Sequence, residues 1–179
     1  MDKKRILWIT RTGVFCALLI IIQAATSLFA NTLITGSLVN LMLITSVLIN
    51  GLGSGVAVAL ISPILARLFG IGPLWSLIPC IMLGNLTLIL CWHFILGKMR
   101  FSMNVSRILA LIVGAGLKFA VLYISIVMIT IPMFLNLPPQ KAAVISATFS
   151  VAQFFTATVG GILALIIVPI VKSAIKYEG

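Results

Sequence analysis

The sequence predicts an all-α membrane protein: a bundle of about six transmembrane helices with the N and C termini cytoplasmic. Hydrophobic residues make up 62% of the 179 residues, and charged residues make up 8%, whereas a soluble domain carries about a quarter charged residues. The apolar stretches are also longer than the core helix of a soluble protein requires. Residues 1–179 are expected to form a single integral membrane domain, because the chain is too short for a membrane unit plus a soluble catalytic domain.

The first three spans are expected at residues 6–29, 38–49 and 56–69. A hydrocarbon core of about 30 Å needs about 20 helical residues, so the second and third segments are short. The glycine-rich stretch 51–55 separates them, and one long broken helix is an alternative interpretation. Residues 70–73 (Gly-Ile-Gly-Pro) end the third span, because glycine permits positive φ and proline cannot continue a helix.

The remaining spans are expected at residues 77–96, 108–131 and 142–171. A basic, polar connection separates the fourth from the fifth. Pro132 and the turn at residues 136–139 close the fifth span. The sixth span runs from there to the basic C-terminal end.

Lysine and arginine collect in three places, which predicts the orientation. Basic residues resist translocation and gather in cytoplasmic segments. The three places share one side of the membrane because an even number of spans separates each pair. This predicts a multi-pass protein of a bacterial cell (inner) membrane, and it explains the net charge of +10 as a topology signal. The basic residues in these places are Lys3, Lys4, Arg5 and Arg11, then Lys98, Arg100 and Arg107, then Lys172 and Lys176. Arg67 and Lys141 are the exceptions, one near each remaining outer turn.

The acidic residues are Asp2 and Glu178, one at each end of the chain, and this scarcity excludes several chemistries. No carboxylate is available at membrane depth for proton coupling, for paired acid–base catalysis or for a serine triad. His93 is the single histidine, so a metal site is not expected. The sequence also lacks a phosphate-binding loop that would hold ATP. We therefore expect no enzyme, no metal and no cofactor, and any transport must draw its energy from a partner or from a solute gradient.

Lys118 is the principal candidate for a ligand-binding residue. It lies eleven residues past Arg107, about 16 Å along a helix axis, which is close to the bilayer centre. Charges at this depth are unfavourable and usually functional. A lysine that snorkels to the surface or bonds helix carbonyls is the alternative. We favour a cation that binds the carboxylate or phosphate of a ligand.

Further polar residues lie at similar depth or in the expected outer turns. Asn85 and Gln153 lie two to three turns inside their spans, and interhelical hydrogen bonding is an equally good explanation of Gln153. Trp75 is also explained as an interfacial anchor, and Arg67 as a side chain that snorkels outward. Tyr123 stays undecided. The candidate substrate-binding set is Lys118, Asn85, Gln153, Arg67, Trp75, Thr35, Asn31 and Tyr123.

Residues 35–40, 70–73 and 78–85, together with the length and topology, resemble the substrate-binding S component of an energy-coupling factor (ECF-type ABC) vitamin transporter. The resemblance implies high-affinity binding of a vitamin or related micronutrient from outside, such as pantothenate, a pyridoxine derivative or a corrinoid. It implies a transmembrane coupling subunit and two ATPase subunits as partners. It also implies a site in the outer half of spans four to six, closed by the first outer loop.

In that family the first helix docks on the coupling subunit through two alanines four residues apart. Gly13 and Ala17 are the matching positions here, and small residues at this spacing allow close helix approach. Three other functions stay open at this point. The chain is alternatively a self-sufficient small-solute carrier or channel, a membrane enzyme acting on lipid, or a structural subunit that binds no small molecule.

Overall fold

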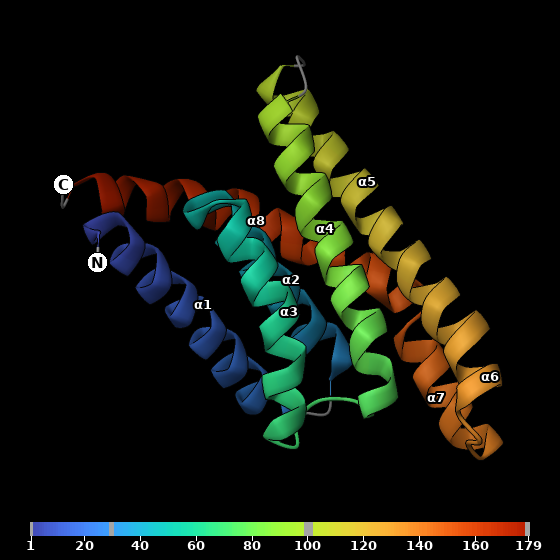
Figure 1. The fold of residues 1–179 in the computed structure, drawn as a ribbon. Coiled ribbons are helices and arrows are strands. Elements are labelled where there is room, and N and C mark those ends of the chain that lie inside the picture. Colours follow the sequence, from blue (N-terminus) through green and yellow to red (C-terminus); the bar gives the residue numbers. More distant parts are fainter. Residues whose placement is uncertain (1, 29–30, 99–101, 178–179) are drawn as a thin grey trace.

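The computed structural model describes residues 2–28, 31–98 and 102–177, and within these ranges the chain is helical and contains no β-strand (Figure 1). Five helical segments are long and apolar enough to cross a membrane, and the shorter apolar helix Leu52–Leu68 accompanies them. The predicted all-α fold is thereby confirmed, and several of its helices are long and apolar enough to cross a membrane. The helices are α1 (Lys3–Ser27), α2 (Thr32–Asn50), α3 (Leu52–Leu68), α4 (Ile78–Lys98), α5 (Met103–Leu122), α6 (Ile131–Phe134), α7 (Pro139–Thr148) and α8 (Val151–Tyr177).

Helices α2 and α3 are separate, and α2 begins six residues before the predicted start at residue 38. Its first turn is capped by Asn31, whose side chain accepts hydrogen bonds from the backbone N–H groups of Leu33 and Ile34. A single residue, Gly51, separates α2 from α3 with φ of 84°. A side chain is strained in this left-handed region, so glycine allows the tight reversal.

The last two predicted spans differ from the structure in their interiors. Helix α5 continues through a π-helical stretch, Tyr123–Thr130, into α6, so Pro132 does not end the span. The predicted span 142–171 is divided into α7 and α8 around Phe149. At this break, the Gln153 side chain donates a hydrogen bond to the Thr148 carbonyl at 3.0 Å and satisfies a carbonyl at the end of α7.

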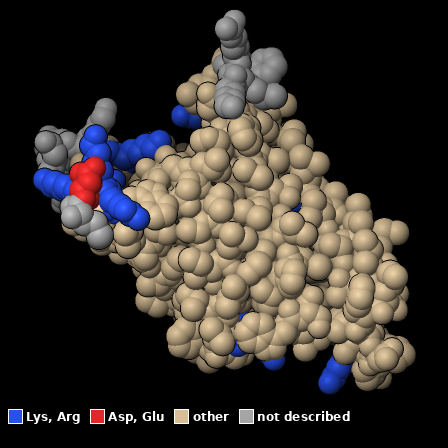
Figure 2. Space-filling view, viewed as in Figure 1, with Lys and Arg blue, Asp and Glu red and all other residues tan. Residues whose placement is uncertain are grey.

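The two chain ends lie near each other at one end of the bundle (Figure 1). Figure 2 shows the largest group of lysine and arginine at that end, a few more at the opposite edge, and an uncharged surface between them. Large apolar side chains are exposed along the helices, including Ile21 and Ile170 at 62% each. An uncharged apolar surface of this kind suits contact with lipid rather than water.

Helices α2 and α8 form the most extensive helix–helix contact in the described chain. Gly160 on α8 permits this approach, because a Cβ there would lie 2.6 Å from both the Ser37 carbonyl oxygen and the Asn40 Cβ. Small residues of this kind are typical of close helix crossings in membranes. The contact fixes the position of Asn40, which lines a cavity between the helices.

Helix α1 is held differently at its two ends. Near the N terminus, the Thr12 hydroxyl donates to the Ser54 hydroxyl at 2.9 Å, and the Asn50 side-chain amide donates to Thr12 at 3.1 Å. Near the other end, one side-chain hydrogen bond joins α1 to α2 within the described residues, from the Thr35 hydroxyl to the Thr26 hydroxyl at 2.8 Å. The side-chain hydrogen bonds that join α1 to its neighbouring helices are therefore concentrated near its N-terminal end.

Replacing Gly160 with alanine should lower the thermal stability of the purified protein. The added methyl group forces α2 and α8 apart, and such overpacking destabilises by about 1–3 kcal/mol. Thermal unfolding in detergent, followed by circular dichroism, measures the effect. Gly116→Ala is the matched control, because nothing lies within 4 Å of a Cβ at Gly116. Equal unfolding temperatures for the two variants would contradict the assigned contact.

Candidate functional site

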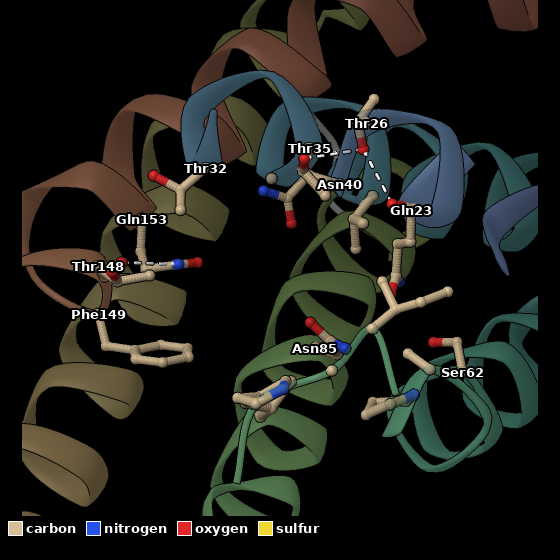
Figure 3. A pocket seen from close by; sticks show the side chains of 18 of the residues that line it. Gln23, Thr26, Thr32, Thr35, Asn40, Ser62, Asn85, Thr148, Phe149 and Gln153 are labelled. Atoms are coloured by element: carbon tan, nitrogen blue, oxygen red, sulfur yellow. Dashed lines mark hydrogen bonds between the residues drawn. The ribbon is translucent and has the colours of Figure 1, made fainter. Parts of the chain in front are cut away.

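A cavity of about 310 Å³ lies in the half of the bundle away from the N terminus. It is lined by the last turns of α1 and α3, the first turns of α2 and α4, the end of α5 and the break between α7 and α8. Figure 3 shows polar side chains from these separate elements facing one space. Its volume is at the small end of ligand pockets, which span about 300–1,000 Å³.

Lys118 lies in the wall of this cavity and is only 3% exposed. Its Nζ donates hydrogen bonds to two amide oxygens, the Oδ1 of Asn40 at 2.6 Å and the Oδ1 of Asn85 at 2.9 Å. Neither partner carries a charge. Because the acidic residues Asp2 and Glu178 are at the ends of the chain, the ammonium group has no internal counter-anion at this depth. The predicted alternatives of snorkelling and of bonding to helix carbonyls do not describe its contacts.

Asn40 is held in turn by α8. Its Nδ2 donates to the Thr156 hydroxyl at 3.3 Å, and that hydroxyl donates to the Gln153 carbonyl at 3.2 Å. Asn40 lies eight residues past the first residue of α2, about 12 Å along the helix axis. The close crossing at Gly160 thus places the amide beside Lys118. Thr156 and Gly160, which helical spacing predicts to share a face, both contact α2.

Hydroxyl and amide groups from α1 and α2 line part of the cavity. The paired hydroxyls of Thr26 and Thr35 join α1 to α2 there (Figure 3). Gln23 contributes an amide from α1, and Asn31 lines the cavity while its Oδ1 caps α2. On the facing side the Phe149 ring, which is 9% exposed, lies along the cavity wall. This arrangement combines apolar walls with several hydrogen-bonding groups, as small-molecule sites usually do.

The structure brings five of the eight predicted substrate-binding residues to this cavity and leaves three outside its lining. The five that line it are Lys118, Asn85, Gln153, Thr35 and Asn31.

Arg67, Trp75 and Tyr123 do not line the cavity. The Arg67 guanidinium donates to the Gly72 carbonyl at 3.4 Å, and its Cζ lies 5.9 Å from the centre of the Trp75 ring. Trp75 is 52% exposed, and Tyr123 is 37% exposed with its ring against Phe119. The assistance of Lys118 by Arg67 stays a prediction, and in this structure the Arg67 guanidinium is engaged at the turn that follows α3.

Sequence reasoning missed several residues that line the cavity, above all Asn40, and also Gln23, Thr26 and Phe149. The depth argument that selected Asn85 applies equally to Asn40, since both are amides well inside apolar spans. Phe149 carries no comparable signal, because neither proline nor glycine marks the break between α7 and α8. Residues 29–30 lie outside the described residues, so closure of the site by the first outer loop stays a prediction.

Gly13 and Ala17, the predicted docking pair, are both exposed on α1. A Cβ added at Gly13 would have no neighbour within 4 Å. Among the described residues, no group of three or more histidine, cysteine, aspartate or glutamate side chains gathers to hold a metal ion.

Comparison of the chain with known protein families, curated proteins and solved structures finds no match.

Substitutions of Asn40 should reveal the charge on Lys118 through protein stability. Asn40→Leu removes an acceptor from the buried ammonium and should destabilise the protein by about 1–3 kcal/mol. Asn40→Asp has the same shape but supplies a counter-anion, so its stability should equal or exceed that of the wild type. Thermal unfolding of both variants in the same detergent makes the comparison. Equal destabilisation by leucine and aspartate would contradict a charged Lys118.

Proposed function

We propose that this chain is a high-affinity, membrane-embedded substrate-binding subunit for uptake of a vitamin or related micronutrient, energised by partner subunits. The observation that carries the proposal is the cavity beside Lys118. Its cation is buried among neutral amides in an apolar bundle, and a buried charge is unfavourable unless something pairs with it. A ligand that brings a negative charge into the cavity supplies the missing partner. We propose no catalytic activity, because no acid–base pair lies at this depth.

We propose that the termini are cytoplasmic and that the protein resides in a bacterial cell membrane. The clustered lysines and arginines near the chain ends support this orientation (Figure 2). The cavity is built from the helix ends away from the N terminus, so in this orientation it faces outward. An outward-facing cavity suits capture of a scarce solute from the surroundings.

The proposed partners are a transmembrane coupling subunit and two ATPase subunits of an energy-coupling module. The sequence contains no phosphate-binding loop for ATP, and intramembrane carboxylates for proton coupling are absent from it. The sequence resemblance to S components supplies the identity of these partners. Among vitamins of that class, the cavity volume of about 310 Å³ favours pantothenate or a pyridoxine derivative over a corrinoid, whose macrocycle is far larger.

Purified chain in lipid vesicles should bind a labelled vitamin without accumulating it. We expect no net uptake by vesicles that contain the chain alone, and ATP-dependent uptake when the coupling and ATPase subunits are added. Radiolabelled pantothenate and pyridoxal phosphate, with filtration of the vesicles, measure both quantities. Concentrative uptake or rapid counterflow by the chain alone would instead identify a self-sufficient carrier or channel. Turnover of lipid would identify an enzyme.

Gly13→Trp should separate binding from coupling. The exposed position accepts a bulky side chain without disturbing the bundle, so vitamin binding and thermal stability should be unchanged. The indole should block close approach of a helix of the coupling subunit and reduce its co-purification at least about tenfold, a loss of about 1.4 kcal/mol. Ile112→Trp on α5, where Ile112 is 56% exposed, is the matched control. Equal co-purification of both variants would exclude this face of α1 as the docking surface.

A further inference from the structure

Unused hydrogen-bond donors face the cavity beside Lys118. A lysine ammonium has three N–H groups and no acceptor. Two of them are engaged, one with Asn40 at 2.6 Å and one with Asn85 at 2.9 Å. In its charged form, Lys118 therefore keeps one donor for a group outside the protein.

The amide of Asn85 provides a further donor. Because the ammonium only donates, both asparagine oxygens must point towards Lys118, and both Nδ2 groups must point away from it. The Asn40 Nδ2 is engaged with Thr156. The Asn85 Nδ2 has no hydrogen-bond partner among the described residues.

The Asn85 Nδ2 is not sealed inside the protein. In the described part of the chain, Thr45 Oγ1 is the sole side-chain nitrogen or oxygen atom that is both sealed from open space and without a partner. Since Asn85 is 97% buried (3% exposed) and lines the cavity, the Nδ2 reaches open space there (Figure 3). Lys118 and Asn85 thus each keep one donor for a group in the cavity, on either side of the Asn85 Oδ1.

The charge of the cavity limits what that acceptor group can be. Lys118 is the one charged residue in the lining within the described chain, and Arg67 is engaged elsewhere. A dianionic phosphate would keep an uncompensated negative charge, and a cationic or zwitterionic ligand would bring a positive charge that nothing in the lining neutralises. Each of these is unfavourable in a buried site. One negative charge balances the site.

We infer that the site selects small monocarboxylates whose remaining part is uncharged and carries hydroxyl or amide groups. This inference rests on the proposed binding function and narrows it to one ligand class. One carboxylate oxygen accepts the third N–H of Lys118, and the other accepts the Asn85 Nδ2. The neutral part of the ligand lies along Phe149 and reaches the hydroxyls of Thr26 and Thr35. The cavity volume of about 310 Å³ corresponds to about ten water molecules, so the ligand is small.

Matched pairs of carboxylate and neutral compounds test this inference by calorimetry on the purified full-length chain. The probes are pantothenate with panthenol, biotin with biotinamide, and nicotinate with nicotinamide. Pyridoxal phosphate serves as a phosphate dianion and thiamine as a cation. We expect at least one carboxylate to bind about 30-fold tighter than its neutral partner, the range of a charge-assisted hydrogen bond in a buried site.

Two variants test whether Lys118 and Asn85 cause the preference for carboxylates. Lys118→Met should reduce the ratio between carboxylate and neutral partner to less than about threefold. Asn85→Leu should weaken carboxylate binding about tenfold and neutral binding by less than about threefold. Lys141→Met removes an exposed lysine of α7 outside the cavity lining and should leave the ratio unchanged.

The possible results distinguish failure of the monocarboxylate selectivity from failure of the proposed binding function. Tight binding of a neutral, cationic or phosphorylated probe, with an affinity that Lys118→Met leaves unchanged, would overturn the inference and leave the binding function standing. If a chain that unfolds cooperatively binds none of the probes, the proposed vitamin-binding function is overturned together with the inference.

Discussion

A single buried lysine, held between two neutral amides, imposes the main constraint on this molecule. Burial removes the water that would stabilise a charge on Lys118. The Oδ1 atoms of Asn40 and Asn85 supply only part of that stabilisation. Hydrogen bonds to charged groups are stronger than neutral ones, so the three residues order one another. They come from α5, α2 and α4, and the arrangement therefore depends on the packing of the whole bundle.

The helix packing provides that order through close backbone contact together with a core of buried apolar side chains such as Trp92, Leu43 and Leu88. In lipid, apolar burial between helices supplies little driving force, and close packing and hydrogen bonding matter more. The absence of a side chain at Gly160 lets α8 approach the backbone of α2. Thr156 on α8 then receives the Asn40 amide, so the same crossing both stabilises the bundle and aligns the site.

Composition and span length predicted the all-helical fold, because long apolar stretches favour helices of membrane-spanning length. The burial of Lys118 and Asn85 agrees with their positions well inside such stretches. The sequence did not predict the break at Phe149, because the Gln153 side chain satisfies the α7 end without any proline or glycine. Nor did the sequence show that Arg67 lies outside the cavity lining. Its hydrogen bond to the Gly72 carbonyl depends on how the turn after α3 folds back.

The unequal hydrogen bonding of α1 at its two ends has a consequence for the shape of the cavity. Parting the hydroxyls of Thr26 and Thr35 breaks one bond between helices, whereas the contacts of Thr12 with Ser54 and Asn50 stay intact at the opposite end. Such a fluctuation is local, and its free energy is far below that of global unfolding. The end of α1 beside the cavity is therefore held by fewer interhelical hydrogen bonds than its start, and its displacement would widen the cavity without altering the α2–α8 crossing.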